Sequence, residues 1–383
     1  MATSLSPGVH LDIVQRKPAP AFDTGVPAFL GFVPDELRPA GSRIVSVDAA
    51  LFSALSAKLP ASSQDSFLGA ALRGFFDNGG RRCYLVAQEP GGMAGLDPGL
   101  DELEALSDFD LLCAPDLVRL GSPRELADAQ RRLLAFVRLK RGVFAILDSI
   151  PCAGLSPQSD LELIKAHRAA LVGAPGAACA ALYAPSLRTR PGELIPPSGH
   201  VAGVFARTDR EIGVHKAPAN TPFAGVIDVS LRPGPAAIEE LSGLGINLLR
   251  PFPGRGIRIF GARTLEGESG VSFVNGRRLV LTVGRWLEAT LAGLAFEPHD
   301  QNLWLRIKRD VNALLGELFD RGALVGTTRE EAYFVKCDDE TNPQAVRDAG
   351  QIVAEIGLSP RAPSEVVHLR VILGKEGVSA ASV

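Results

Sequence analysis

Two histidines, two aspartates and an asparagine fall within residues 196–230, where a short helical stretch leads into a turn rich in proline and glycine. Such side chains can act as general acids and bases or as metal ligands. His200 and His215 are fifteen residues apart, with a helix and a turn between them, and this is not the spacing of a helical metal site. We therefore interpret His200, Asp209, His215 and Asn220 as residues that fix a rigid structural joint at the end of a sheet.

A second candidate for chemistry is Asp148, which directly follows the expected strand 143–147. Open α/β sheets often carry catalytic groups at the carboxyl ends of strands, and Asp110 and Asp228 also lie on or beside strands. Three such acids could hold Mg²⁺ for phosphotransfer or hydrolysis. In the other interpretation Asp148 begins a capped turn. The sequence favours the turn, because no glycine-rich phosphate loop and no GxSxG elbow accompany the acids.

Composition narrows the classes of protein. A chain of 383 residues is long enough for two or three domains, and 46% apolar residues provide ample core. The net charge of −3 argues against binding nucleic acid by phosphate neutralisation. The sequence has no run of 18 apolar residues, so no membrane span is predicted, and the N-terminus does not resemble a signal peptide. The five scattered cysteines indicate reduced thiols, and we expect neither a metal nor a cofactor.

The elements that must position these residues change in character along the chain. Residues 101–260 alternate short apolar strands with helices, which predicts an α/β layer with a largely parallel sheet. Residues 261–360 read instead as an α+β domain with two long amphipathic helices, 277–296 and 302–319. Residues 21–100 form the first part of the core. The overall class is thus α/β, or α+β when the whole chain is considered.

Both ends of the chain have the alternating pattern of an extended strand. Apolar residues alternate with polar ones in the predicted N-terminal arm, residues 1–20, and in the predicted C-terminal arm, residues 361–383. A lone strand is marginally stable, so we expect each arm to pair with a sheet elsewhere. The inward-facing residues of the two arms are Val9, Leu11 and Ile13, and Val367, Leu369 and Val371.

A set of short motifs is spread over most of the chain, and none of them is catalytic. The motifs are GVPAFLG at 25–31, FFDNGGRRCY at 75–84, ILD at 146–148, PPSGHVAG at 196–203, RTD at 207–209, HKAPAN at 215–220, GIN at 245–247, GARTL at 261–265, VNGRR at 274–278, FEPHD at 296–300, LW at 303–304, GAL at 322–324 and FVKCD at 334–338. Together they resemble the motifs of contractile tail sheath proteins, the family of phage tail sheaths, R-type pyocin sheaths and the sheaths of extracellular contractile injection systems. With 383 residues there is little room for the large outer domains of many phage sheaths, so the chain resembles a minimal sheath.

The resemblance implies a structural subunit and not an enzyme. It implies stacked hexameric rings around an inner tube, arms that add strands to neighbouring subunits, and contraction that drives the tube through a target envelope. It also implies a tube-facing helix in the C-terminal domain, for which Arg306, Lys308 and Arg309 favour residues 302–319. The implied partners are further copies or sheath paralogues, the tube protein, baseplate and tail-terminator proteins and, in injection systems, an AAA+ ATPase. Assembly in the bacterial cytoplasm, within a phage tail or a tail-like particle that is released, is implied as well.

Overall fold

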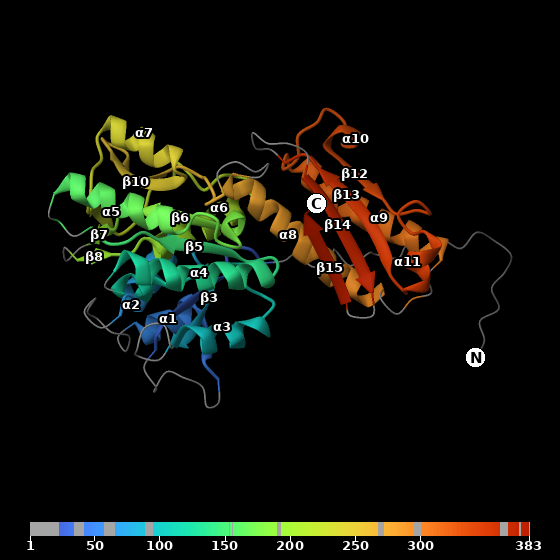
Figure 1. The fold of residues 1–383 in the computed structure, drawn as a ribbon, viewed down its shortest axis with the longest axis horizontal. Helices are drawn as coiled ribbons and strands as arrows, with labels where there is room; N and C mark the ends of the chain where they lie inside the picture. The colour runs from blue at the N-terminus through green and yellow to red at the C-terminus, as the bar shows by residue number, and fades with distance from the viewer. Residues whose placement is uncertain are drawn as a thin grey trace.

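The computed structural model describes residues 23–33, 42–56, 66–88, 95–120, 122–152, 154, 156–189, 193–266, 272–294, 297, 300–360, 367–374 and 377–382. The predicted N-terminal arm, with Val9, Leu11 and Ile13, lies outside these residues. Figure 1 shows two parts, an α/β part and a C-terminal part, with one long helix running between them.

The α/β part is built on one sheet whose strand order is β11-β10-β6-β5-β4-β1-β3-β2. The five inner pairings are parallel, and only the outermost pairings, β2 with β3 and β10 with β11, are antiparallel. The prediction of a largely parallel sheet is therefore confirmed. The strands are β1 (Pro27–Phe32), β2 (Ile44–Asp48), β3 (Arg82–Gln88), β4 (Leu111–Cys113), β5 (Phe144–Asp148), β6 (Ala180–Ala184), β10 (Ile246–Phe252) and β11 (Gly256–Phe260).

Helices cover both faces of this sheet, as a parallel sheet requires. Alternate residues of each strand enter two separate cores: Ala145 and Leu147 of β5 face one side, and Phe144 and Ile146 face the other. The first face is covered by α3 (Leu96–Glu104), α4 (Pro123–Leu139), α5 (Pro157–Ala170) and α7 (Pro235–Gly243), and the second by α1 (Ala49–Leu55), α2 (Leu68–Asp77) and α6 (Ser198–Glu211).

Two sequence expectations about this part need correction. The sheet takes β1, β2 and β3 from residues before the expected boundary at 100, so residues 21–100 and 101–260 share a single sheet. Residues 226–229 lie in the stretch expected to form one largely parallel sheet, but they form β9 (Val226–Val229), which pairs in a small second sheet with β7 (Leu187–Thr189); β7 also pairs with β8 (Leu194–Ile195). Short 3-10 turns complete the part at η3 (Pro115–Arg119) and η4 (Ala177–Cys179).

The C-terminal part packs helices against a four-stranded antiparallel sheet in the order β12-β13-β14-β15. A third apolar core, separate from the two cores of the α/β part, lies between these helices and this sheet and includes Trp286, Trp304 and Val371. The elements are α8 (Val274–Leu291), η5 (Ala292–Leu294), α9 (Gln301–Asp320), α10 (Arg329–Ala332), β12 (Tyr333–Lys336), α11 (Gln344–Asp348), β13 (Ile352–Leu358), β14 (Val367–Gly374) and β15 (Gly377–Ser382).

The predicted C-terminal arm strand is β14, and it is an inner strand of this sheet. It pairs with β13 along its whole length, from Val367 opposite Leu358, and with β15 on its other side. The side chains of Leu369 and Val371 are buried in the C-terminal core. As the chain is folded here, β14 has no free edge, and the edges of the sheet among the described residues belong to β12 and β15.

Candidate functional site

The site with the most buried charge joins the two parts of the chain. Arg278 of α8 binds Asp209 of α6 with two parallel hydrogen bonds, Nη2 to Oδ2 at 2.6 Å and Nη1 to Oδ1 at 2.9 Å. Its Nη2 also lies 2.9 Å from Oδ2 of Asp110, the residue before β4. The three side chains are only 2–5% exposed. We call Arg278, Asp209 and Asp110 the junction cluster.

Asp110 and Arg278 have further partners outside the junction cluster. The carboxylate of Asp110 accepts the backbone amides of Gly25 at 3.1 Å and Val26 at 2.7 Å, so it fixes the start of β1. The guanidinium of Arg278 stacks 4.9 Å from the centre of the Phe205 ring. Gly25 has a positive φ of 74°, and a Cβ there would lie 2.4 Å from the Cα of Ala206, so the position needs glycine.

Opposing electrostatic effects act on the pKa values of Arg278 and Asp209. Burial alone would lower the pKa of Arg278, but the adjacent carboxylates outweigh burial and raise it. Burial raises the pKa of Asp209, and the Arg278 guanidinium acts against that shift. Removing one partner from such a buried pair leaves an unpaired charge, which costs about 3–5 kcal/mol. The cluster therefore makes the position of α8 relative to α6 specific.

Polar contacts continue along α8 at helical spacing on both sides of the cluster. Asn275 donates to the backbone carbonyl of His215 at 2.9 Å, and Arg285 donates to that of Ser107 at 3.3 Å. Glu288 pairs with Arg141 at 3.8 Å. A different face of α8 belongs to the apolar C-terminal core, with members Leu279, Val283, Trp286, Leu287 and Leu291. The helix thus packs by apolar contact on one side and by directed polar contact on the other.

The structure brings only some of the predicted joint residues to this junction. Asp209 is part of the cluster. His215 lies nearby: its backbone carbonyl accepts a hydrogen bond from Asn275, and the residue lines a neighbouring pocket. Asn220 lies apart, at the edge of the main sheet, where its amide donates to Ile259 at 2.8 Å and its φ is +58°. His200 also lies apart, at the contact between α6 and α2.

The α6–α2 contact explains the buried histidine. A Cβ at Gly199 would lie 2.2 Å from the carbonyl oxygen of Ala71, and a Cβ at Gly74 would lie 2.2 Å from the imidazole of His200. His200 is 3% exposed, and Nδ1 has no hydrogen-bond partner among the described residues. Burial lowers its pKa to about 4, so the ring is neutral at pH 7. His200 fills space between two closely packed helices, which is a structural role.

Asp148 also has a structural environment. Its side chain is buried, and Oδ1 accepts the backbone amide of Ser198 at 2.7 Å, so it caps the first turn of α6. Burial raises its pKa to about 7, and this hydrogen bond acts in the opposite direction. Its carbonyl accepts from Gln130 at 2.8 Å. Asp148 therefore has a structural environment, but its side chain caps α6 and not the turn that follows it in sequence.

The three acids of the enzyme alternative are far apart. Leu111 lies beside Phe144 in the parallel β4–β5 pair, so Asp110 lies at the amino ends of the strands and Asp148 at their carboxyl ends, roughly 16 Å along the sheet. Asp228 lies in the small second sheet, paired with Arg232. No group of three potential metal ligands occurs in the part of the chain that the structure describes. The Mg²⁺-dependent hypothesis is wrong for these residues.

The positively charged residues suggested for a tube-facing helix lie on α9. Arg306 and Arg309 are exposed, and Lys308 is half-buried. Arg306 pairs with Glu297 at 2.6 Å, and Arg309 with Asp310 at 3.1 Å. The outer face of α9 is therefore charged but partly neutralised within the chain.

Sequence reasoning missed Arg278 and the role of Asp110. Arg278 lies within one of the motifs, but no role was assigned to it. The spacing in the sequence could have indicated its role. Arg278 and Arg285 are seven residues apart and flank the apolar stripe of their helix, which indicates a second, polar contact face. Asp110 was considered only as a magnesium ligand, because a partner more than 160 residues away in sequence cannot be found from spacing.

Comparison with known proteins identifies the family. The phage tail sheath protein central domain matches residues 165–265, which span α5 to β11. A chain in the cryo-EM structure of the anti-feeding prophage baseplate is 31% identical, with a TM-score of 0.76, and the match covers 94% of this chain and 97% of that one. A chain of the anti-feeding prophage helical sheath in the contracted state is 29% identical, covers 94% and 97%, and has a TM-score of 0.73. The chain belongs to the contractile tail sheath family.

A curated relative supports this membership over a shorter segment. The tail sheath protein of Vibrio phage KVP40 is 26% identical over 170 residues, which is 43% of this chain but only 24% of that protein. This sheath protein therefore aligns with about a quarter of the phage sheath. The family and the fold are those of structural proteins and not of enzymes. None of the helices in the described ranges is long and apolar enough to span a membrane.

Proposed function

We propose that this sheath protein is the subunit of a contractile sheath, which polymerises around an inner tube and contracts to drive the tube through a target envelope. The observation that carries the proposal is the match to a helical sheath over 94% of the chain, at 29% identity. That match includes both parts of the molecule, so the junction between them belongs to the shared architecture. The contracted state and the helical assembly are properties of the relative and are proposed for this chain.

Stacked hexameric rings, contact with an inner tube and association with a baseplate are parts of the same proposal. A similar chain is present in a six-fold symmetrised baseplate, which supports six-fold rings and baseplate association. The exposed Arg306 and Arg309, with Lys308 beside them, support α9 as the tube-facing helix, because charged side chains on one face can steer and orient a partner. Tail-terminator proteins, sheath paralogues and an AAA+ ATPase are further proposed partners. The particle is proposed to assemble in the bacterial cytoplasm and to be released.

The strand arms are proposed as the links between subunits. Residues 1–20, with Val9, Leu11 and Ile13, have the pattern of a strand that could pair with an edge of a neighbour's C-terminal sheet. The described edges of that sheet are β12 and β15. The strand of Val367, Leu369 and Val371 pairs within its own chain here, so its exchange between subunits would replace one set of strand pairings by an equivalent set.

Electron microscopy of the purified protein and of lysate particles tests the proposal. We expect striated sheaths or hollow contracted cylinders in negative stain. A chain without residues 1–17 should fold but fail to assemble, whereas the full chain should assemble. Protein that stays monomeric at all concentrations, alone and with its tube protein, would contradict the proposed function.

A further inference from the structure

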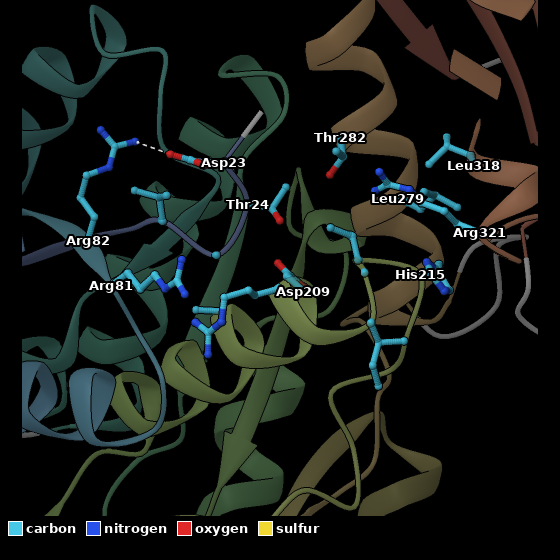
Figure 2. Close-up of a pocket in the computed structure, with 17 residues that line it drawn as sticks. Asp23, Thr24, Arg81, Arg82, Asp209, His215, Leu279, Thr282, Leu318 and Arg321 are labelled. Atoms are coloured by element: carbon cyan, nitrogen blue, oxygen red, sulfur yellow. Dashed lines mark ion pairs between the residues drawn. The ribbon is translucent and has the colours of Figure 1, made fainter. Parts of the chain in front are cut away.

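A basic pocket lies next to the junction cluster. Its volume is about 440 Å³, and it is formed by the residues before β1, the end of α6, α8 and the end of α9. Figure 2 shows Arg81, Arg82 and Asp209 on one side of it and Leu279, Leu318 and Arg321 on the other. The pocket is thus bounded by both parts of the chain.

The charges around the pocket are unbalanced. Four arginines line it, namely Arg81, Arg82, Arg210 and Arg321, against two carboxylates, Asp23 and Asp209. Arg278 already neutralises Asp209, and Arg82 pairs with Asp23 at 3.6 Å and with Asp108 at 2.8 Å. Arg321 pairs with Glu317, and Arg210 donates to the carbonyl of Gly79 and lies 4.0 Å from Glu211. No hydrogen bond or ion pair joins the exposed Arg81 to another described residue. Arg81 and the exposed, weakly paired Arg210 can therefore meet an incoming anion, and guanidinium groups favour carboxylates.

The same chain carries a helix of the opposite charge. The nine residues of α3 include Asp97, Asp101, Glu102 and Glu104 and no basic residue. Asp101 and Glu104 are exposed and three residues apart, so they lie on one face of the helix. Asp101 makes no hydrogen bond or ion pair with another described residue, whereas Asp97 pairs with Arg132. This face of α3 presents carboxylates to a partner.

We infer that the basic pocket receives the acidic face of α3 from a second copy of the chain. This inference rests on the proposed self-assembly and identifies one of its contacts. Because the pocket and α3 are different surfaces, the contact is heterologous, and repeating it builds an open polymer or a ring. Its pairs are Arg81 and Arg210 of one copy with Asp101 and Glu104 of the next.

Charge reversal tests the contact. One variant combines Arg81→Glu with Arg210→Glu, and the other combines Asp101→Arg with Glu104→Arg. Each alone should raise the critical concentration for polymerisation about tenfold or more, because like charges then face each other. Sedimentation and negative-stain microscopy measure assembly, and circular dichroism with thermal melting checks folding. The matched control, Arg131→Glu with Arg138→Glu on the exposed side of α4, should polymerise as wild type does.

Mixing the two variants gives the decisive measurement. In an equimolar mixture the reversed pocket meets the reversed α3, and the unchanged pocket meets the unchanged α3, so polymerisation should return to within about threefold of wild type. The chain with all four substitutions should also recover. Polymerisation of either variant at the wild-type concentration, or failure of the folded variants to recover when mixed, overturns the contact. A wild type that never polymerises contradicts the proposed function instead, and so the two failures are distinguishable.

Discussion

Helix α6 contacts its two helical neighbours by opposite means. Against α2 it packs through glycines and apolar side chains, so close that a Cβ at Gly203 would lie 2.5 Å from the carbonyl oxygen of Phe75. Against α8 it presents Asp209, and the contact consists of buried, directed hydrogen bonds to Arg278. The first contact tolerates small shifts of side chains but no added volume. The second contact is sensitive to the loss of either charged partner, because an unpaired buried ion is costly.

This difference matches the place of each contact in the fold. The α2–α6 contact lies inside the α/β part and holds one layer of helices against one sheet. The α6–α8 contact joins that part to the C-terminal part, which has its own core. Interfaces between domains are generally more polar than cores, and relative motion is their default. The junction cluster specifies one position of the C-terminal part relative to the α/β part, at an interface where relative motion is otherwise expected.

Breaking the junction cluster should have the largest effect. Arg278→Met leaves Asp209 and Asp110 buried without their cation and should lower the free energy of unfolding by about 3–5 kcal/mol. Urea denaturation of the protein under non-assembling conditions measures the loss. Adding Asp209→Asn to Arg278→Met should recover part of it, since the buried carboxylate then loses its charge together with its cation; Asp110 is kept, because both its oxygens accept backbone amides. A double variant less stable than Arg278→Met would contradict the role of unpaired charge.

The cap of α6 should make stability depend on pH. Asp148 has a folded pKa near 7 and an ordinary value of 3.8, so its proton is bound more tightly in the folded state. Its contribution is therefore complete below pH 4 and is lost as the pH rises to 7. Asp148→Asn keeps an acceptor for the Ser198 amide and has no such loss. Its stability relative to wild type should rise between pH 4 and 7 by roughly 2–4 kcal/mol, as measured by urea titrations at each pH.

The neutral His200 has the opposite pH dependence, which separates the two effects. Its folded pKa of about 4 is below the ordinary value of 6.5, so its contribution is present above pH 6.5 and is lost as the pH falls to 4. The difference between Asp148→Asn and wild type cancels this common term. A difference that stays flat from pH 4 to 7 would show that Asp148 titrates normally.

Added volume should break the α2–α6 contact more mildly. Gly203→Leu places a side chain against the backbone of α2 and should cost about 1–3 kcal/mol by overpacking, without dependence on pH. The matched control is Gly243→Ala in α7, where no atom lies within 4 Å of the added Cβ. That change should be neutral or slightly stabilising, because alanine favours helix. Thermal melting of both variants side by side compares them.

Much of this fold could be predicted from the sequence, and the exceptions have physical causes. Alternation of short apolar strands with helices predicted the parallel sheet, because strands buried on both faces must be apolar throughout. The same rule does not say in which sheet a strand pairs, so β9 was misplaced. Helix α11 ends at Asp348 and residues 352–358 form β13, because pairing with β12 and β14 decides the state of so short a run.

The site was less predictable than the fold. The sequence predicts a structural joint for residues 196–230, and most residues of α6, which lies within them, are buried. The position of Asp209 in the junction cluster depends on Arg278 and Asp110, which come from distant parts of the chain. Sequence spacing describes neighbours on one helix or strand. Tertiary pairs of this kind become visible only when the sheet brings the elements together.

The exposed end of the α8 junction should respond least. Arg141 lies 3.8 Å from Glu288, and their side chains are 49% and 28% exposed. Water screens such a pair, so Arg141→Gln should change the free energy of unfolding by only about 0–1 kcal/mol, and less at high salt. Urea denaturation at low and high ionic strength measures this. A loss as large as that of Arg278→Met would mean that the polar contacts along α8 act as one cooperative unit; a small loss would confine the specificity of the junction to its buried centre.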